Sequence, residues 1–378
     1  MLNRRELLAG AGAGVAAVWL AGCGESTSDA ERDAGAGGSE LVMPQGTWWM
    51  PAEEARHEAT WMCLPGRADV WGRFLPETQQ TIADIALAIA AFEPVRMLVR
   101  PADLDRAGDL MGSDVELIEA PVDDLWARDT LPLFVIDGAG ALAAGRVRFN
   151  GWGDKQVHDG DTTLAAIVAE ILDVELIDSG IVGEGGGLEV DGEGTLMAAR
   201  SSWINNNRNP GTGEAEISDV LVELLGAERI LWVDGVAGQD ITDGHIDTLA
   251  RFTNPTTILN EAPSYVEPGE TWYDVYVATA AALEEFRTLD GAPYDLVTLR
   301  QPENIRGGGD EFLASYVNYY VCNDAVLVPE FGDDAADGLA AEQIGEQYPD
   351  REVVALNIDP VSAGGGGIHC ATQQQPAV

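Results

Sequence analysis

The chain has 378 residues, about twice the usual length of one domain, so we expect either several domains or one repetitive architecture. Hydrophobic residues make up 46% of it, which excludes a disordered or collagen-like chain. The 21 basic residues, of which Lys155 is the one lysine, and 64 acidic residues give a formal net charge of −43. Such a polyanion repels phosphate backbones, which argues against nucleic acid as a partner and favours small cations. Solubility in a salty environment is the simpler explanation of the acidity.

The N-terminus has the pattern of an export signal. Arg4 and Arg5 precede an apolar, glycine-rich run over residues 7–21, which is shorter than the roughly 20 residues that a membrane-spanning helix needs. The run closes with Leu20-Ala21-Gly22-Cys23, which is similar to the lipobox of bacterial lipoproteins. The alternative is a disordered start with an unrelated cysteine.

The export interpretation divides the chain into three parts. We expect a twin-arginine-type lipoprotein signal over residues 1–23, with lipidation of Cys23 and anchoring at the outer face of the cell membrane. Residues 24–40, rich in Gly, Ser, Ala, Asp and Glu, are typical of a flexible tether. Residues 41–378 would form the folded domain, and this anchor would be its sole contact with a membrane.

Within residues 41–378 an amphipathic helix, an apolar strand and a polar, glycine-containing segment recur in that order. The apolar residues of the predicted helices recur at three- and four-residue spacing, and the predicted strands are short and rich in β-branched residues. The helices are predicted at 77–93, 161–172, 213–225, 274–287 and 335–348, and the strands at 95–99, 174–177, 229–233, 295–299 and 353–358.

The polar segments are centred near Asp129, Gly187, His245, Asp310 and His369, at spacings of 58, 58, 65 and 59 residues. Self-similarity at a fixed period favours a stacked or circular repeat over two unrelated domains. An open solenoid needs polar capping units at its ends, and the sequence shows none.

The two ends of the repeat complement each other. Residues 53–65 form a hairpin-like piece with no helix before it, and the last unit has no helix after His369. Pairing of the two termini would close such a split unit, as it does in propellers. The predicted fold class is therefore α/β, a closed ring of five units in which the polar segments meet at one central site.

The remaining cysteines have different surroundings. Cys63 and Cys322 lie in apolar runs, which is typical of buried packing thiols, although the sequence leaves a disulfide between them open. An odd number of cysteines remains beside a lipidated Cys23, so at least one thiol should be free. No Cys-x-x-Cys is present and the four histidines are scattered, so we expect no metal site.

Cys370 follows four glycines, in a segment that continues with threonine, glutamines and proline. Glycines at this density permit close approach of the backbone to a ligand. A thiol there can act as a nucleophile when a neighbouring cation or base favours the thiolate. The alternative is a flexible tail with an incidental cysteine.

His245 and Asp247 lie two residues apart and follow Asp240. In an extended strand this spacing would direct the imidazole and the carboxylate to the same side. A pair of this kind serves structural roles as often as catalytic ones, so both interpretations stay open.

Two further segments carry single carboxylates. Trp126 and Asp129 lie close together before a predicted strand over 133–136, and an aspartate beside an aromatic surface suits a planar cation. Glu184 lies in a glycine-rich turn. The alternative for each segment alone is a solvated surface turn.

Taken together, these segments favour attack on a cationic carbon. The sequence contains no serine nucleophile elbow, no P-loop and no dinucleotide-binding glycine fingerprint. A cysteine, a histidine and several carboxylates suit a guanidinium, because carboxylates can bind its outer nitrogens and leave the central carbon open to sulfur.

The segments resemble those of the agmatine deiminase and bacterial peptidylarginine deiminase family, within the guanidino-modifying superfamily of five-bladed, pseudo-symmetric α/β propellers (pentein-like folds). The matches run along nearly the whole of residues 41–378. They are Met50-Pro51-Ala52-Glu53, His57-Glu58-Ala59-Thr60-Trp61, Trp126-Ala127-Arg128-Asp129-Thr130, Asn150-Gly151-Trp152-Gly153, Glu184-Gly185-Gly186, Val190-Asp191-Gly192-Glu193-Gly194-Thr195, Asn207-Arg208-Asn209-Pro210, Asp243-Gly244-His245-Ile246-Asp247, Tyr316-Val317-Asn318 and Gly366-Gly367-Ile368-His369-Cys370-Ala371-Thr372-Gln373-Gln374-Gln375-Pro376.

This resemblance implies a role for each site residue. Cys370 would be the nucleophile, His245 the general acid and base, and Glu184 the group that orients the histidine. Asp129 and Asp247 would bind the guanidinium, and the pocket would be lined by Trp126 and Asn318. The reaction would pass through a covalent thiouronium-type intermediate and release ammonia and a ureido product, with no metal or organic cofactor.

Three functions agree with these observations. The first is hydrolysis of agmatine to N-carbamoylputrescine and ammonia, and the second is deimination of arginine in peptides or proteins. Peptidyl-arginine relatives carry arginines after the asparagine that matches Asn150, whereas this chain has Gly151, Gly153 and Asp154, which resembles the agmatine branch. The third is a lipoprotein that only binds guanidino compounds or polyamines, against which Cys370 argues. The sequence allows a homo-oligomer without fixing its size.

Overall fold

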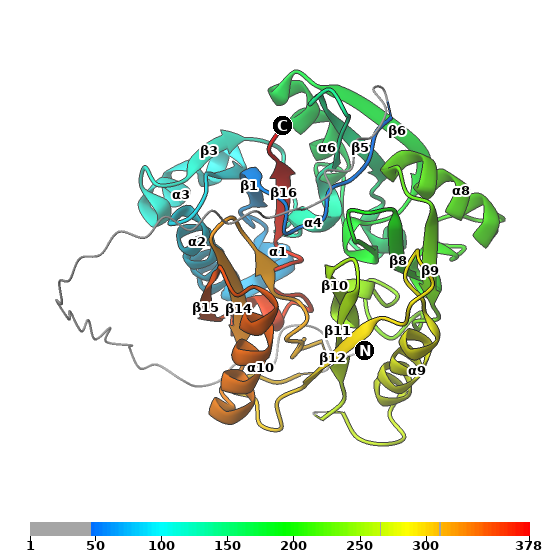
Figure 1. Ribbon diagram of the computed structural model, residues 1–378. Helices are drawn as coiled ribbons and strands as arrows, with labels where there is room; N and C mark the ends of the chain where they lie inside the picture. The colour runs from blue at the N-terminus through cyan, green and yellow to red at the C-terminus, as the bar shows by residue number, and fades with distance from the viewer. Residues whose placement is uncertain (1–46, 265, 310) are drawn as a thin grey trace, which may run out of the picture. The chain divides into compact units, whose positions relative to one another are not determined.

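The computed structural model describes residues 47–264, 266–309 and 311–378. The expected signal (1–23), tether (24–40) and lipidation site Cys23 lie outside these residues, as does Asp310. The described part of the predicted catalytic domain is a mixed α/β fold built from five small sheets with helices (Figure 1). None of its described helices has the length and apolar character needed to cross a bilayer.

Four of the sheets repeat one pattern, in which an antiparallel hairpin is followed by a helix and a third strand parallel to the second. Their strands are β4 (Leu133–Ile136), β5 (Leu142–Arg148) and β6 (Glu175–Val182); β7 (Leu188–Val190), β8 (Thr195–Ala199) and β9 (Arg229–Val233); β10 (Ala250–Asn254), β11 (Thr257–Ala262) and β12 (Asp295–Arg300); and β13 (Tyr320–Val321), β14 (Ala325–Glu330) and β15 (Glu352–Asn357).

The fifth sheet joins the two ends of the domain. Its order is β16 (Thr372–Pro376), β1 (His57–Cys63), β2 (Val95–Val99) and β3 (Glu116–Glu119). Strand β1 runs antiparallel to β16, so the predicted pairing of the termini is confirmed (Figure 1). The prediction of a hairpin-like piece over 53–65 was wrong, because the antiparallel partner of β1 comes from the other end of the chain. Five sheets closed in this way agree with the predicted five-bladed arrangement.

A long helix precedes the third strand of each repeat, and the predicted helices and strands are confirmed with small shifts of their ends. The apolar stripe predicted for α2 is buried at Ile82, Ile85 and Ile89. The helices α8, α9 and α10 lie on the outside of the sheets in Figure 1. The long helices are α2 (Leu75–Ala90), α6 (Asp161–Leu172), α8 (Glu214–Leu225), α9 (Thr271–Glu285) and α10 (Asp334–Gln347), and the short ones are α1 (Ala68–Trp71), α3 (Leu104–Met111), α4 (Ala127–Thr130), α5 (Gly151–Asp154), α7 (Arg200–Trp203) and α11 (Asp359–Ser362).

The polar segments occupy equivalent places in the five repeats, because each precedes the first strand of the antiparallel pair in its sheet. Asp129 precedes β4, Gly187 precedes β7 and His245 precedes β10, while His369 precedes β16. In the fourth repeat the equivalent described residue is Asn318, before β13, and not the predicted centre at Asp310. The repeat therefore delivers one polar segment from every sheet to a common site.

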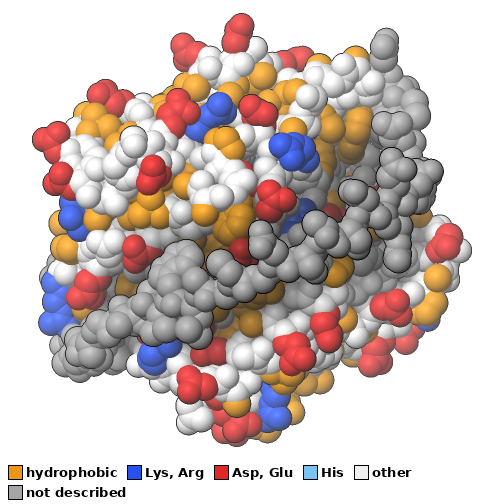
Figure 2. Space-filling view, turned by 60° about the vertical axis from the view of Figure 1, so that its left-hand side comes forward, with side chains coloured by type: hydrophobic (Ala, Val, Ile, Leu, Met, Phe, Trp, Pro, Cys, Tyr) orange, Lys and Arg blue, Asp and Glu red, His pale blue; other side chains and the backbone are white. Residues whose placement is uncertain are grey.

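Acidic side chains spread over the face of the molecule that Figure 2 shows, and basic side chains are fewer there. The strands β6, β12 and β15 consist mainly of exposed and half-buried residues, as expected for strands at a sheet edge that faces solvent. The negative charge predicted from composition is thus carried on the surface.

Candidate active site

Cys370 lies between the glycine run and β16, and its residue is 8% exposed. Its Sγ is 3.2 Å from Asn318 Nδ2, and the Asn318 side chain also accepts a hydrogen bond from the Cys370 backbone N–H at 3.3 Å. Burial, followed by the charges of Asp247 and Asp129, raises the pKa of the Cys370 thiol well above its usual range. The site by itself therefore holds a thiol, and a bound cation would favour the thiolate.

The glycine run before Cys370 packs against the residues predicted to line the pocket. A Cβ at Gly366 would overlap the ring of Trp126, and one at Gly367 would overlap the side chain of Asn318. The close backbone approach predicted from the glycines is therefore to these two side chains, which fix the segment that carries the thiol.

His245 immediately precedes the 3-10 turn η4 (Ile246–Thr248) and is buried. Its Nδ1 lies 3.8 Å from Asp129 Oδ1, and its Nε2 lies 3.4 Å from Glu184 Oε2. Burial opposes the charged form, but Asp129 and Glu184 raise the pKa of His245 to about 9. The imidazole is therefore protonated at neutral pH and can act as an acid.

The prediction of a strand at His245 and Asp247 was wrong. Asp247 belongs to the 3-10 turn and His245 precedes it in extended conformation, so their common direction comes from the turn and not from a two-residue strand period. Both side chains nevertheless approach the same point, as the position of Gly186 shows below.

Glu184 lies beside the His245 imidazole and is 1% exposed. Arg208 Nε donates to both of its carboxylate oxygens, at 2.8 and 3.0 Å. Burial opposes ionisation, but His245 and Arg208 lower the pKa of Glu184. Arg208 also pairs with Asp243 at 2.6 Å, which in turn contacts Lys155 at 2.8 Å. This buried ion-pair chain holds Glu184 charged beneath the histidine.

Asp129 lies in α4 and its two oxygens have different donors. The Trp152 indole Nε1 donates to Oδ2 at 2.9 Å, and the Gly186 backbone N–H donates to Oδ1 at 3.0 Å. Burial raises the pKa of Asp129, and the charges of Glu184 and Asp247 raise it further. A cation bound beside this carboxylate would relieve that repulsion.

Asp247 is completely buried and has one oxygen without a hydrogen-bond partner among the described residues. His369 Nδ1 contacts Oδ2 at 2.8 Å, and Cys370 Sγ lies 3.5 Å from the same oxygen. Oδ1 is the unpartnered atom. Because buried carboxylate oxygens are normally hydrogen-bonded, Oδ1 is suited to accept from a ligand.

Trp126 is 5% exposed, and its indole Nε1 donates to Asp124 Oδ2 at 3.1 Å. Asp124 also accepts from Trp71 Nε1 at 2.7 Å, and the two indole rings lie 6.3 Å apart. Asp124 thus fixes both tryptophans beside the glycine run.

Gly186, in the 3-10 turn η3 (Gly185–Gly187), marks the point on which three side chains converge. A Cβ at Gly186 would lie 2.7 Å from His245 Nδ1, 2.9 Å from Asp129 Oδ1 and 3.1 Å from Asp247 Oδ2. The structure thus brings together all seven residues predicted for the site. They are Cys370, His245, Asp129, Asp247, Glu184, Trp126 and Asn318.

Several residues of the site were not identified from the sequence. Gly186, Trp152, Arg208 and Glu53 all occur in the matching stretches quoted above, but their types alone gave no role. Asp124 had no such signal.

The other cysteines lie outside the site. Cys63 and Cys322 are buried and free, so they form no disulfide with each other. Burial raises the pKa of both thiols. The described residues contain no group of histidine, cysteine, aspartate or glutamate side chains arranged to hold a metal ion.

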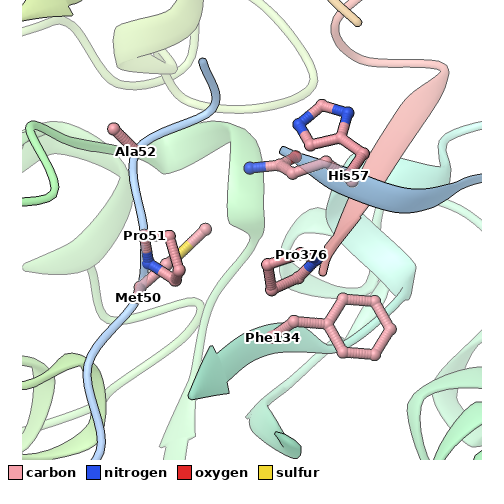
Figure 3. A pocket seen from close by; sticks show the side chains of 7 residues that line it. Met50, Pro51, Ala52, His57, Phe134 and Pro376 are labelled. Carbon is pink, nitrogen blue, oxygen red and sulfur yellow. The ribbon is translucent and has the colours of Figure 1, made fainter. Parts of the chain in front are cut away.

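A separate small hollow lies near the pairing of the chain ends (Figure 3). None of the seven predicted site residues lines it. Its lining consists of Met50, Pro51, Ala52, His57, Phe134, Gln374 and Pro376.

A buried thiol, a protonated imidazole and paired carboxylates, all delivered by five mixed sheets, define a hydrolase that acts on a guanidino C–N bond. Comparisons with known proteins agree. The sequence profile of the Porphyromonas-type peptidyl-arginine deiminase family matches residues 49–376, so the chain belongs to this family and the predicted resemblance is confirmed.

Curated relatives and solved structures resemble the chain over most of its length. A protein of Legionella pneumophila (strain Paris), named "Putative agmatine deiminase", is 35% identical over 87% of this chain and 95% of its own. A protein of the same name from Streptomyces coelicolor is 35% identical over 87% and 99%. The structure of the agmatine deiminase of Enterococcus faecalis is similar with a TM-score of 0.82, at 29% identity over 87% of this chain and 96% of that one.

Proposed function

We propose that the protein hydrolyses agmatine to N-carbamoylputrescine and ammonia, with Cys370 as the nucleophile. The observation that carries the proposal is the convergence on Gly186, which the His245 imidazole and the Asp129 and Asp247 carboxylates all approach closely. A guanidinium bound beside these groups would meet both carboxylates while the thiol approaches its carbon, since Cys370 Sγ lies 3.5 Å from Asp247 Oδ2.

The substrate cation would itself prepare the nucleophile. Without substrate, burial and the two aspartates keep Cys370 protonated. A guanidinium between Asp129 and Asp247 offsets their charges, which lowers the free energy of the thiolate, and the thiol proton passes to solvent. The thiolate then forms a C–S bond to the guanidinium carbon, and a neutral tetrahedral adduct results.

His245 serves both later steps. It donates its proton to one amino group of the adduct, the C–N bond breaks, and ammonia leaves a thiouronium on Cys370. The neutral imidazole then takes a proton from water as the water oxygen attacks the same carbon. Cleavage of the C–S bond, with transfer of the remaining hydroxyl proton to the departing sulfur, gives the ureido product and regenerates the Cys370 thiol. Glu184, held by Arg208, stabilises the imidazolium at the start of each catalytic cycle.

The basic residues around the site favour agmatine over free arginine. Recognition of an α-carboxylate would need an available cation. Within the described part of the site the basic side chains are already paired with carboxylates: Arg208 with Glu184 and Asp243, Lys155 with Asp243, and Arg128 with Glu53. Agmatine has no carboxylate and needs no such partner.

A product assay tests this proposal. The protein, expressed from residue 41, is incubated with agmatine, free arginine and a short arginine peptide, and ureido product and ammonia are both measured. We expect turnover of agmatine at the highest kcat/KM. Turnover of the peptide alone would refute the agmatine proposal in favour of peptidyl-arginine deimination, and binding without any turnover would indicate a binding protein.

We further propose that the protein is exported and anchored at the outer face of the cell membrane through a lipid on Cys23. The support is the sequence of the first 23 residues, in which a twin arginine, an apolar run and a lipobox-like end occur in order. Cys23→Ala should release the protein from the membrane fraction of the native host, and Arg4→Lys with Arg5→Lys should block export. Wild-type fractionation of both variants would exclude the anchor.

A further inference from the structure

His369 connects the proposed guanidinium-binding carboxylate to a buried ion-pair network that the proposed reaction does not use. Its residue is 2% exposed, and each ring nitrogen faces a carboxylate. Nδ1 lies 2.8 Å from Asp247 Oδ2, and Nε2 lies 3.0 Å from Glu53 Oε2. A neutral imidazole carries one N–H, so only an imidazolium can donate to two ionised carboxylates at once.

Glu53, which precedes β1, is the fixed end of this connection. Arg128 Nη2 contacts its Oε2 at 3.0 Å, and Arg251 Nη2 contacts its Oε1 at 2.9 Å. The Val321 backbone N–H also donates to Oε1, at 2.9 Å. Burial opposes ionisation of Glu53, but Arg251, His369 and Arg128 hold its pKa well below the usual range. Glu53 is therefore a buried anion that cannot turn away from His369.

Burial raises the pKa of Glu189, but when all three carboxylates of the network are ionised, charge balance requires a charged His369. Three carboxylates and two arginines leave one negative charge, which the imidazolium cancels. Two further charged groups lie near the Asp247 end of the network. They are His245, which precedes η4, and Asp129, which belongs to α4. The members of the network are Asp247, Glu53, Glu189, Arg128, Arg251 and His369, with Glu189 Oε1 3.7 Å from His369 Nε2 and 2.9 Å from Arg251 Nε.

We propose that His369 and Glu53 are positioning residues for the guanidinium site: an imidazolium held by Glu53 fixes the Asp247 carboxylate and leaves its Oδ1 free to accept a hydrogen bond from the substrate. The proposal rests on the proposed function, since it assigns Asp247 to substrate binding. Its physical content is that the hydrogen bond to Oδ2 sets the direction of Oδ1, the oxygen without a partner among the described residues. A neutral or absent ring would leave Asp247 free to rotate and easier to protonate.

Kinetics of His369→Gln and Glu53→Gln against pH test the proposal. A hydrogen bond to a charged group is worth roughly 1.5–3 kcal/mol, so we expect kcat/KM for agmatine to fall by about 10- to 100-fold in either variant. The fall should lie mainly in KM, and the acidic limb of the profile should move to higher pH because Asp247 loses the adjacent cation. The double variant should be no worse than His369→Gln, since both changes break one connection.

Glu93→Gln is the matched control. Glu93 is also a buried carboxylate, and it contacts His57 Nδ1 at 3.0 Å and the Asn323 backbone N–H at 2.7 Å, away from Asp247. Its profile should keep the wild-type acidic limb even where thermal stability falls. A folded His369→Gln protein within threefold of wild type and with an unmoved acidic limb would overturn the proposal, as would the same shift in Glu93→Gln.

Two further measurements do not depend on turnover, and the first of them needs no variant. In wild-type protein labelled with ¹⁵N-histidine, the His369 ring should carry protons on both nitrogens at pH 7, and a neutral ring would overturn the proposal. In Cys370→Ala protein, Glu53→Gln should weaken agmatine binding by about tenfold by calorimetry. If wild-type protein turns over no guanidino compound, the proposed function fails while these two results still decide the role of His369.

Discussion

Gly186→Ala adds one methyl group at the point where the catalytic side chains converge. The new Cβ would lie 2.7 Å from His245 Nδ1, 2.9 Å from Asp129 Oδ1 and 3.1 Å from Asp247 Oδ2, whereas ordinary contacts begin at 3.4 Å. The imidazole must therefore retreat by about 0.7 Å and the carboxylates by about 0.5 and 0.3 Å. Misplacement of reacting groups by about 1 Å can cost about 100-fold in rate, so we expect kcat/KM for agmatine to fall by about 10- to 100-fold.

The fold should tolerate this substitution, because Gly186 is not among the glycines with positive φ. Gly108→Ala is the control: Gly108 lies in α3, has no neighbour within 4 Å of the position that the alanine Cβ would occupy, and should gain about 0.5–1 kcal/mol of stability with unchanged kcat/KM. Circular dichroism and thermal melting establish folding, and initial ureido-product rates give the kinetics. A folded Gly186→Ala enzyme within threefold of wild type would refute the assignment of the guanidinium site to the side chains that converge on Gly186.

Three other predictions concern the charged groups of the protein. Asp129→Asn and Asp247→Asn should each cost about 2–5 kcal/mol in kcat/KM for agmatine, the range for removing one partner of a buried charge pair. Asp350→Asn, in an exposed turn, should change kcat/KM by less than about 1 kcal/mol. Equal effects of all three substitutions would contradict guanidinium binding by the two buried aspartates. The pKa of His245 is raised from 6.5 to about 9, so kcat/KM for agmatine, which reports the free enzyme, should fall above pH 9. The stability that this imidazole contributes, complete below pH 6.5, should be lost as pH rises through 9, and thermal melting of His245→Gln should lack that loss. Burial raises the pKa of Glu261 from 4.5 to about 8, so its contribution to stability should be complete below pH 4.5 and lost as pH rises through 8. The melting temperature of Glu261→Gln should depend less on pH over this window. An unchanged pH dependence would contradict the raised pKa of Glu261.

Much of the secondary structure could be predicted because its signals are local. The limits of α6, β2 and β9 agree with the predicted ranges, since an amphipathic stripe or a short β-branched run determines each of them. The helix α3 and the strand β3 were not predicted. The prediction followed the repeat of one helix and one strand, and these two elements are additions to a single repeat. In the four three-stranded sheets the hairpin strands were also missed, except β4, which agrees with the predicted range 133–136, since hairpin strands such as β7 and β13 are too short to show a period.

The site shows the same division between local and distant information. The sequence provided the seven side chains but could not provide the distances between them, because these depend on five sheets meeting around one point. The ion-pair chain under His245 depends on Arg208 and Lys155, which are distant from it in sequence. The turn at Ile246–Thr248 shows why the strand prediction failed: three residues forming a 3-10 turn can direct two side chains as a strand would.

Trapping of the covalent intermediate tests the central claim most directly. Protein quenched in acid during turnover of agmatine, digested and analysed by mass spectrometry should carry a thiouronium-type adduct on Cys370, and Cys370→Ala should carry none while it still binds agmatine. Cys63 and Cys322 are buried and free, and they serve as internal controls in the same digest. An adduct on either of these cysteines, or full turnover by Cys370→Ala, would contradict the account.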